Sequence, residues 1–159
     1  ASVKKPKRAK SSGDPIQEEA LRDLTVGAKM IKVVTALIKN PEDKVLLHRR
    51  AMPRQFGGRL ETPGGKANPD EDLRVALARE LAEELGIVDP IVGLKVYTCE
   101  FVDYDPAFTV YFFEVNIRDQ VPTAKEDATD LGWYSLADLD WSECVPSLEG
   151  YLLHKEVNG

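Results

Sequence analysis

The sequence lacks several features that would assign it to common protein classes. It has only two cysteines, Cys99 and Cys144, and they form neither a metal-binding nor a redox spacing. No run of about 18 apolar residues occurs, which excludes a transmembrane helix. The N-terminus has no apolar stretch of the kind found in a secretory signal. We therefore expect a cytoplasmic protein with reduced thiols and no membrane partner.

Negative charge outweighs positive charge outside the first ten residues. The formal net charge is −6, although five basic residues lie between Lys4 and Lys10, so the rest of the chain is strongly acidic. An acidic body is not typical of a nucleic-acid-binding surface, and it would repel a phosphate-rich ligand unless a cation intervened. We interpret residues 1–14 as a disordered basic tail and residues 15–159 as one domain. A nuclear-import or polyanion-binding tail is the alternative.

The hydrophobic patterns predict strands and helices without a regular βαβ repeat. Strands are expected over 30–38, 44–48, 91–102, 109–117 and 132–135, with the first two joined as a hairpin by a turn at 40–43. Helices or helical turns are expected over 15–24, 136–140 and 147–157, in addition to a central helix ending at Leu85. A loop is expected over 53–68. This mixture predicts an α/β sandwich with a mixed sheet.

The central helix has sequence signals at both ends. Asn68 can act as its N-cap, with Pro69 at the first helical position and Glu71 completing a capping box. Gly86 can adopt the left-handed conformation that ends a helix. The predicted buried face consists of residues with helical spacing: Leu73, Leu77, Leu81, Leu85, Ala78 and Ala82.

Three carboxylates lie on one face of this helix. Glu80, Glu83 and Glu84 are three or four residues apart and near the C-terminal end, where the helix dipole disfavours negative charge. A divalent cation such as Mg²⁺ takes carboxylate oxygens and would offset this cost. A solvated acidic face joined by Arg79 is the alternative. The preceding run 63–66 (PGGK) favours the cation, because glycines let the backbone approach a phosphate or metal closely.

The spacing of these residues matches a known family pattern. Gly65, Glu71 and residues 79–87 (RELAEELGI) satisfy every specified position of G-x5-E-x7-R-E-U-x-E-E-x-G-U, in which U is aliphatic. The chain therefore resembles the Nudix hydrolase family, and segments 45–51, 60–66, 125–126 and 133–136 resemble its MutT-like branch. The resemblance covers about residues 29–155. It implies an α/β/α sandwich with a mixed central sheet and a loop-helix-loop catalytic motif.

The resemblance also implies the chemistry and the residues that perform it. The expected reaction is hydrolysis of a nucleoside diphosphate linked to another group, with Mg²⁺ or Mn²⁺. Glu80, Glu83, Glu84 and the Gly64 carbonyl are the expected metal ligands. Glu126 matches a downstream glutamate that binds metal or acts as general base, with Asp127 and Asp130 as alternatives. The remaining expected roles are Arg79 as orienting residue, Glu71 as its structural partner, Glu61 as a residue behind the ligands, and Arg50 and Lys66 as contacts to nucleotide or phosphate.

The resemblance favours a (d)NTP pyrophosphohydrolase that releases a nucleoside monophosphate and pyrophosphate, but the base pocket departs from the MutT pattern. Thr62 occupies a substrate-binding position where an aromatic or aliphatic residue is usual. Segment 145–149 lacks the asparagine that reads an oxidised guanine, and Ser147 or Leu148 falls near that place. Phe56 is the best candidate for stacking on a base. We expect Phe112 and Trp133 in the core.

Other functions stay open on the sequence alone. Tyr104 lies seventeen residues after Ile87, a spacing found in dinucleoside polyphosphate hydrolases. A non-catalytic nucleotide-binding module and an RNA-end hydrolase are further alternatives, and only the basic tail favours RNA. A homodimer is an expectation from homologous folds. His48 and His154 have no visible partners and receive no role.

Overall fold

The computed structural model describes residues 30–125 and 128–159. The predicted basic tail, the predicted helix over 15–24, and the candidate residues Glu126 and Asp127 lie outside these residues. Among the described residues, no helix is long and apolar enough to cross a membrane.

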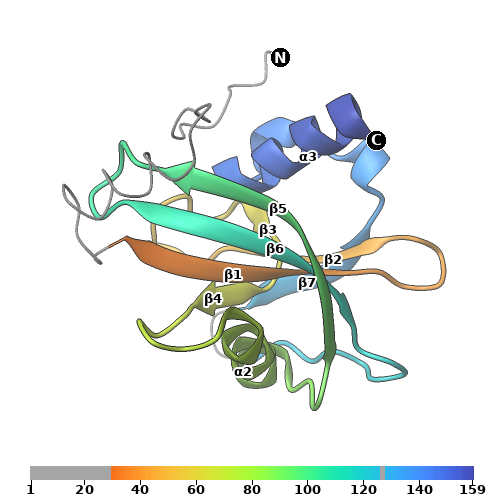
Figure 1. The fold of residues 1–159 in the computed structure, drawn as a ribbon. Coiled ribbons are helices and arrows are strands. Elements are labelled where there is room, and N and C mark those ends of the chain that lie inside the picture. The colour runs from red at the N-terminus through yellow and green to blue at the C-terminus, as the bar shows by residue number, and fades with distance from the viewer. Residues whose placement is uncertain (1–29, 126–127) are drawn as a thin grey trace.

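In the part of the chain that the structure describes, two helices enclose two β-sheets (Figure 1). The strands are β1 (Ile31–Ile38), β2 (Val45–Arg49), β3 (Leu60–Glu61), β4 (Gly64–Lys66), β5 (Ile91–Phe101), β6 (Phe108–Asn116) and β7 (Thr129–Tyr134). The helices are α2 (Leu73–Leu85) and α3 (Pro146–Asn158), with 3₁₀ turns η2 (Leu136–Asp138) and η3 (Trp141–Glu143) before α3.

The larger sheet has the strand order β4-β1-β6-β5 and is mixed. β1 pairs in parallel with β6 and antiparallel with β4, and β5 pairs antiparallel with β6. The smaller sheet, β3-β2-β7, is antiparallel. The expected α/β/α sandwich is confirmed, although its central layer consists of two sheets.

β1 separates two hydrophobic clusters because successive side chains of a strand point to opposite faces. Val34, Ala36 and Ile38 join the cluster that contains the buried face of α2. Leu37 joins the cluster that contains the buried residues of α3. The strand is therefore covered on both faces, and the two helices lie on opposite sides of the sheets (Figure 1).

Several expectations about local structure are wrong. β1 and β2 form no hairpin ladder: they belong to different sheets, and only an isolated bridge joins Lys39 to Val45. The expected loop over 53–68 contains β3 and β4, which are stabilised by pairing with distant strands. Trp133 is 36% exposed, because it lies on β7 at the edge of the smaller sheet, whereas Phe112 is buried as expected.

The start of the central helix is also corrected. α2 is capped by Asp72, whose carboxylate accepts from the backbone N–H groups of Arg74 and Val75. Asn68 is not the cap, because Glu71 is held outside the helix by Arg79. The end at Gly86 is confirmed by its left-handed φ of 68° and ψ of 22°. Ala82, expected on the buried face of the helix, is exposed, and Ala76 is buried instead.

Candidate active site

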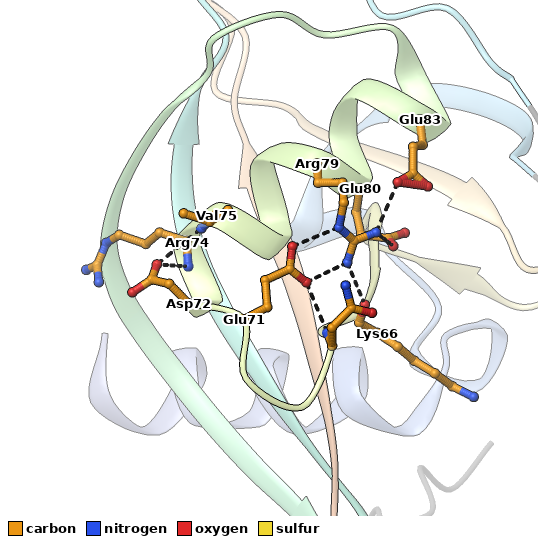
Figure 2. Close-up of polar contacts among 9 residues, drawn as sticks. Lys66, Glu71, Asp72, Arg74, Val75, Arg79, Glu80 and Glu83 are labelled. Carbon is orange, nitrogen blue, oxygen red and sulfur yellow. Dashed lines mark hydrogen bonds and ion pairs between the residues drawn. The ribbon is translucent and has the colours of Figure 1, made fainter.

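Arg79 links the loop before α2 to the acidic face of the helix (Figure 2). Its guanidinium forms a two-point ion pair with Glu71, with both N···O distances at 2.8 Å. The same group donates to Glu80 at 2.8 Å and to Glu83 at 3.0 Å. It also donates to the Lys66 carbonyl at 3.1 Å. The expected pairing of Arg79 with Glu71 is therefore observed, and one cation orients two further carboxylates.

These contacts shift the ionisation of both partners. Hydrogen bonds from Arg79, supported by the Asn68 backbone N–H, lower the pKa of Glu71 to about 2. The Glu71 carboxylate in turn raises the pKa of Arg79 above its ordinary value. Glu71 and Arg79 are therefore both ionised at neutral pH.

Glu84 has other contact partners than Glu80 and Glu83. Its Oε1 accepts from the Gly64 backbone N–H at 3.2 Å and lies 3.6 Å from Nε2 of His48. The same His48 nitrogen lies 3.6 Å from Oε1 of Glu61. The side chains of Glu84 and Glu61 are only 14% and 18% exposed. The buried end of the acidic face therefore contains two carboxylates and one imidazole.

Burial is the main cause of the pKa shifts of Glu84 and His48. Desolvation, reinforced by the negative charges of Glu61 and Glu80, raises the pKa of Glu84 to about 8. Burial lowers the pKa of His48 below its ordinary value, although Glu61 acts in the opposite direction. Burial therefore favours the neutral forms of Glu84 and His48, whereas Arg79 favours the ionised form of Glu71.

Glu80 and Glu84 open into a cavity of about 340 Å³, which we call the carboxylate cavity. Thr62, Gly64 and His48 are part of its wall. Glycine is required at position 64, because a Cβ there would overlap the Val34 carbonyl oxygen of β1. The Thr62 hydroxyl is buried and hydrogen-bonded to Thr35, so it faces the protein rather than a ligand.

A second cavity of about 350 Å³, the aromatic cavity, adjoins the first. Both cavities are lined by the same basic residues, Arg50, Arg54 and Lys66, and also by Glu61 and Ser147. We call these shared basic residues the junction of the two cavities.

Aromatic rings form one end of the aromatic cavity. Tyr104 makes edge contacts with Phe56, Phe101 and Phe108 at centroid distances of 6.1, 5.6 and 5.5 Å. Phe56 reaches this cluster with a φ of 63°, a backbone conformation that is unfavourable for a bulky residue. Gln55 and Asp105 line the same cavity and add polar groups beside the rings. An aromatic wall with a few polar groups is typical of a site for a planar ligand.

The residues fit a hard divalent cation in chemical type but do not form a complete cage. Among residues 30–125 and 128–159, no three Asp, Glu, His or Cys side chains converge in a way that would hold a metal ion. The reason is that Arg79 engages Glu80 and Glu83, while Glu84 contacts the Gly64 N–H. The environment of Glu84 nevertheless favours a cation, since a positive charge there would offset the burial and the nearby carboxylates that raise its pKa.

The structure brings most of the predicted site residues together. Glu80, Glu84, Gly64 and Thr62 line the carboxylate cavity, Arg50 and Lys66 line both cavities, and Phe56 lines the aromatic cavity. Arg79 and Glu83 lie beside the carboxylate cavity on the exposed part of α2. The alternative ligand Asp130 is exposed and lies 3.9 Å from Arg49.

Sequence reasoning missed His48 and Arg54. His48 gives no signal in the sequence, because its contact with Glu61 depends on the β2–β3 register, in which the two residues are directly opposite. β3 has two residues and was not predicted as a strand. Of the two residues near the missing asparagine, Ser147 lines both cavities, whereas Leu148 is fully buried in the core.

Comparison with known proteins identifies the family of this chain. The family described as NUDIX domain matches residues 29–153. The chain belongs to the NUDIX domain family. The Nudix chain is 30% identical to the 8-oxo-dGTP diphosphatase of Escherichia coli K12 over 121 residues, which are 76% of this chain and 92% of that protein. It is 51% identical to the E. coli K12 CTP pyrophosphohydrolase over 59 residues, which are 37% of this chain and 43% of that protein.

A solved structure supports the MutT-like assignment. The crystal structure of the MutT protein from Methanosarcina mazei Go1 has a TM-score of 0.66 and 25% identity, and the alignment covers 82% of this chain and 96% of that chain. The protein is therefore a MutT-like Nudix hydrolase that acts on a phosphoanhydride bond of a nucleotide. Hydrolases of this family generally use a divalent metal ion.

Proposed function

We propose that this Nudix hydrolase is a (d)NTP pyrophosphohydrolase that depends on Mg²⁺, with Mn²⁺ as a substitute. The observation that carries the proposal is that the two cavities adjoin and share basic lining residues. Carboxylates line one end, aromatic rings line the other, and basic side chains lie between them. This order corresponds to the order of metal-binding phosphates, sugar and base in a nucleoside triphosphate.

The acidic end would hold the metal. Glu80, Glu83 and Glu84 are the proposed carboxylate ligands, with the Gly64 carbonyl and Glu126 as additional ligands. The ion, when bound, would neutralise the phosphates and lower the pKa of a bound water. Arg79 keeps Glu80 and Glu83 oriented from behind, since it is tied to Glu71.

The remaining residues would bind the nucleotide. Arg50 and Lys66 lie at the junction of the cavities, where they can contact phosphate oxygens. Phe56 and Tyr104 would place the base in the aromatic cavity, where Gln55, Asp105 and Ser147 supply hydrogen-bonding groups. Thr62 forms part of the cavity wall, and its hydroxyl is already hydrogen-bonded to Thr35. Water attack on a phosphorus then breaks one P–O–P bridge and gives a nucleoside monophosphate and pyrophosphate.

The test is a nucleotide panel with product analysis. The full chain is incubated with Mg²⁺ or Mn²⁺ and with dGTP, 8-oxo-dGTP, dCTP, its 5-methyl form, diadenosine tetraphosphate, ADP-ribose or capped RNA. We expect monophosphate and pyrophosphate from one or more triphosphates, and a loss of at least about 100-fold in kcat for Glu83→Gln. Glu114→Gln is the matched control, because Glu114 is exposed on β6 and lines neither cavity.

The other outcomes would identify another function. Cleavage of diadenosine tetraphosphate alone would favour a dinucleoside polyphosphate hydrolase, a candidate supported by the position of Tyr104 in the aromatic cavity. Nucleotide binding without turnover of any panel member would reject hydrolysis and leave a nucleotide-binding module. Products formed in H₂¹⁸O would show which phosphorus receives the oxygen.

A further inference from the structure

His48 lies beneath the carboxylate cavity and is almost completely enclosed. Its side chain is 3% exposed. Nδ1 lies 3.2 Å from the Arg49 carbonyl oxygen, which can only accept, so Nδ1 carries a proton in this contact. Nε2 is consequently the atom that faces the carboxylates, at 3.6 Å from both Glu61 and Glu84. Nδ1 is therefore hydrogen-bonded to the backbone, whereas Nε2 lies in close contact with both carboxylates at a distance longer than a hydrogen bond.

The two carboxylates come from separate parts of the fold. Glu61 belongs to β3, Glu84 to α2 and His48 to β2. Each carboxylate has a second contact: Arg50 donates to Glu61 at 3.1 Å, and the Gly64 backbone donates to Glu84 at 3.2 Å. A continuous series of polar contacts thus connects the basic junction of the cavities to the acidic face of α2, with His48 at its centre.

Packing of the core alone does not explain a histidine at position 48. The preceding residues of β2, Val45, Leu46 and Leu47, are apolar and fully packed. An imidazole in the same environment has a desolvation cost that an aliphatic side chain would avoid. That cost is offset where the ring orients neighbouring polar groups.

We propose that His48 is a positioning residue that fixes Glu84 and Glu61 relative to each other for binding of the divalent ion. This inference rests on the proposed function, because it takes Glu84 as a ligand. His48 acts through the carboxylates, since its enclosed ring has almost no surface for a substrate. Partners of metal ligands typically change metal affinity by about 10–100-fold when they are removed.

The test measures Mn²⁺ binding without nucleotide, so it does not depend on turnover. Two amide variants separate the two ring nitrogens. His48→Asn keeps a donor for the Arg49 carbonyl but is too short to reach the carboxylates, whereas His48→Gln has the longer reach. From electron paramagnetic resonance titrations we expect the dissociation constant to rise about 10–100-fold for His48→Asn and less than about threefold for His48→Gln. His154→Gln is the control, because His154 lines neither cavity.

A second measurement uses the wild-type chain alone. The chain contains two histidines, so its imidazole ¹H–¹⁵N spectrum has two sets of signals. We expect Mn²⁺ to broaden the His48 signals at concentrations that leave the His154 signals unchanged. Unbroadened His48 signals would overturn the inference even if His48→Asn failed to fold. Unchanged Mn²⁺ affinity in a folded His48→Asn variant would also overturn it.

The outcomes distinguish this inference from the proposed function. Mn²⁺ affinity that depends on His48, in a chain that hydrolyses no nucleotide, would support the positioning role and reject the proposed hydrolase. Nucleotide hydrolysis combined with unchanged Mn²⁺ affinity in His48→Asn would reject the positioning role and retain the hydrolase.

Discussion

The clearest quantitative consequence of the site concerns Glu84 in the metal-free protein. Its carboxylate is 14% exposed, accepts one backbone hydrogen bond and lies near two other carboxylates. Glu84→Gln would keep an oxygen for the Gly64 N–H and remove the charge. We therefore predict that this variant is more stable than wild type at pH 8 without metal, although it loses hydrolytic activity.

The pKa of Glu84 sets both the sign and the size of this effect. It is raised from the ordinary 4.5 to about 8, so between these pH values the folded protein holds a proton that the unfolded chain has lost. Stability therefore falls as pH rises from about 5 to 8. The full shift corresponds to about 5 kcal/mol. Because relaxation and water access reduce such penalties, we expect Glu84→Gln to gain about 1–3 kcal/mol over wild type at pH 8 and little at pH 4.5.

Denaturant unfolding in the presence of a chelator would measure this difference at pH 4.5, 6 and 8. Glu83→Gln is the matched control, because it removes the same charge from the exposed side of α2, where Glu83 is 44% exposed. A Glu84→Gln variant that is less stable than wild type at pH 8, or a difference that does not change with pH, would refute the reasoning.

Two further predictions concern packing and the aromatic cavity. Gly64→Ala should lower the free energy of unfolding by about 3 kcal/mol or more, because its Cβ would overlap the Val34 backbone. Gly132→Ala, the control, should change it by less than about 1 kcal/mol. Chemical denaturation of both variants measures the difference, and equal effects would contradict this prediction. Phe56→Ala should raise KM about tenfold with kcat nearly unchanged, since it removes ring contact with the base but no group at the phosphates. Steady-state kinetics on the preferred triphosphate checks this, and Trp133→Ala, outside both cavities, is the control.

The parts of the site that could be read from the sequence are those set by local spacing. Glu80, Glu83 and Glu84 share a helix, and Gly86 ends it, so the pattern predicted their neighbourhood correctly. The direction of each carboxylate was not predictable, because it depends on partners elsewhere in the chain. Arg79 attracts two of them, and Gly64 and His48 attract the third.

The errors in the fold have a common physical cause. β1 finds its main partner in β6, more than 70 residues later, rather than in the adjacent β2. β3 and β4 are too short to show a period-two pattern, and they exist because β2 and β1 offer free edges. Asn68 is a residue type that often caps helices, but the Arg79–Glu71 ion pair keeps Glu71 outside α2, which begins after Asp72. Contacts outside the local pattern decide these cases: strand pairing for β1, β3 and β4, and an ion pair across eight residues for Asn68.

The distribution of compensating charge suggests how the acidic face is organised before metal binding. One guanidinium, that of Arg79, contacts Glu71, Glu80 and Glu83. Glu84 has no arginine or lysine among its ion-pair contacts in the described part of the chain, and its histidine neighbour has a lowered pKa. At neutral pH burial therefore keeps Glu84 mainly protonated, whereas Glu71 is ionised beside Arg79. A divalent ion bound at Glu84 would offset the burial and the repulsion that disfavour its ionised form.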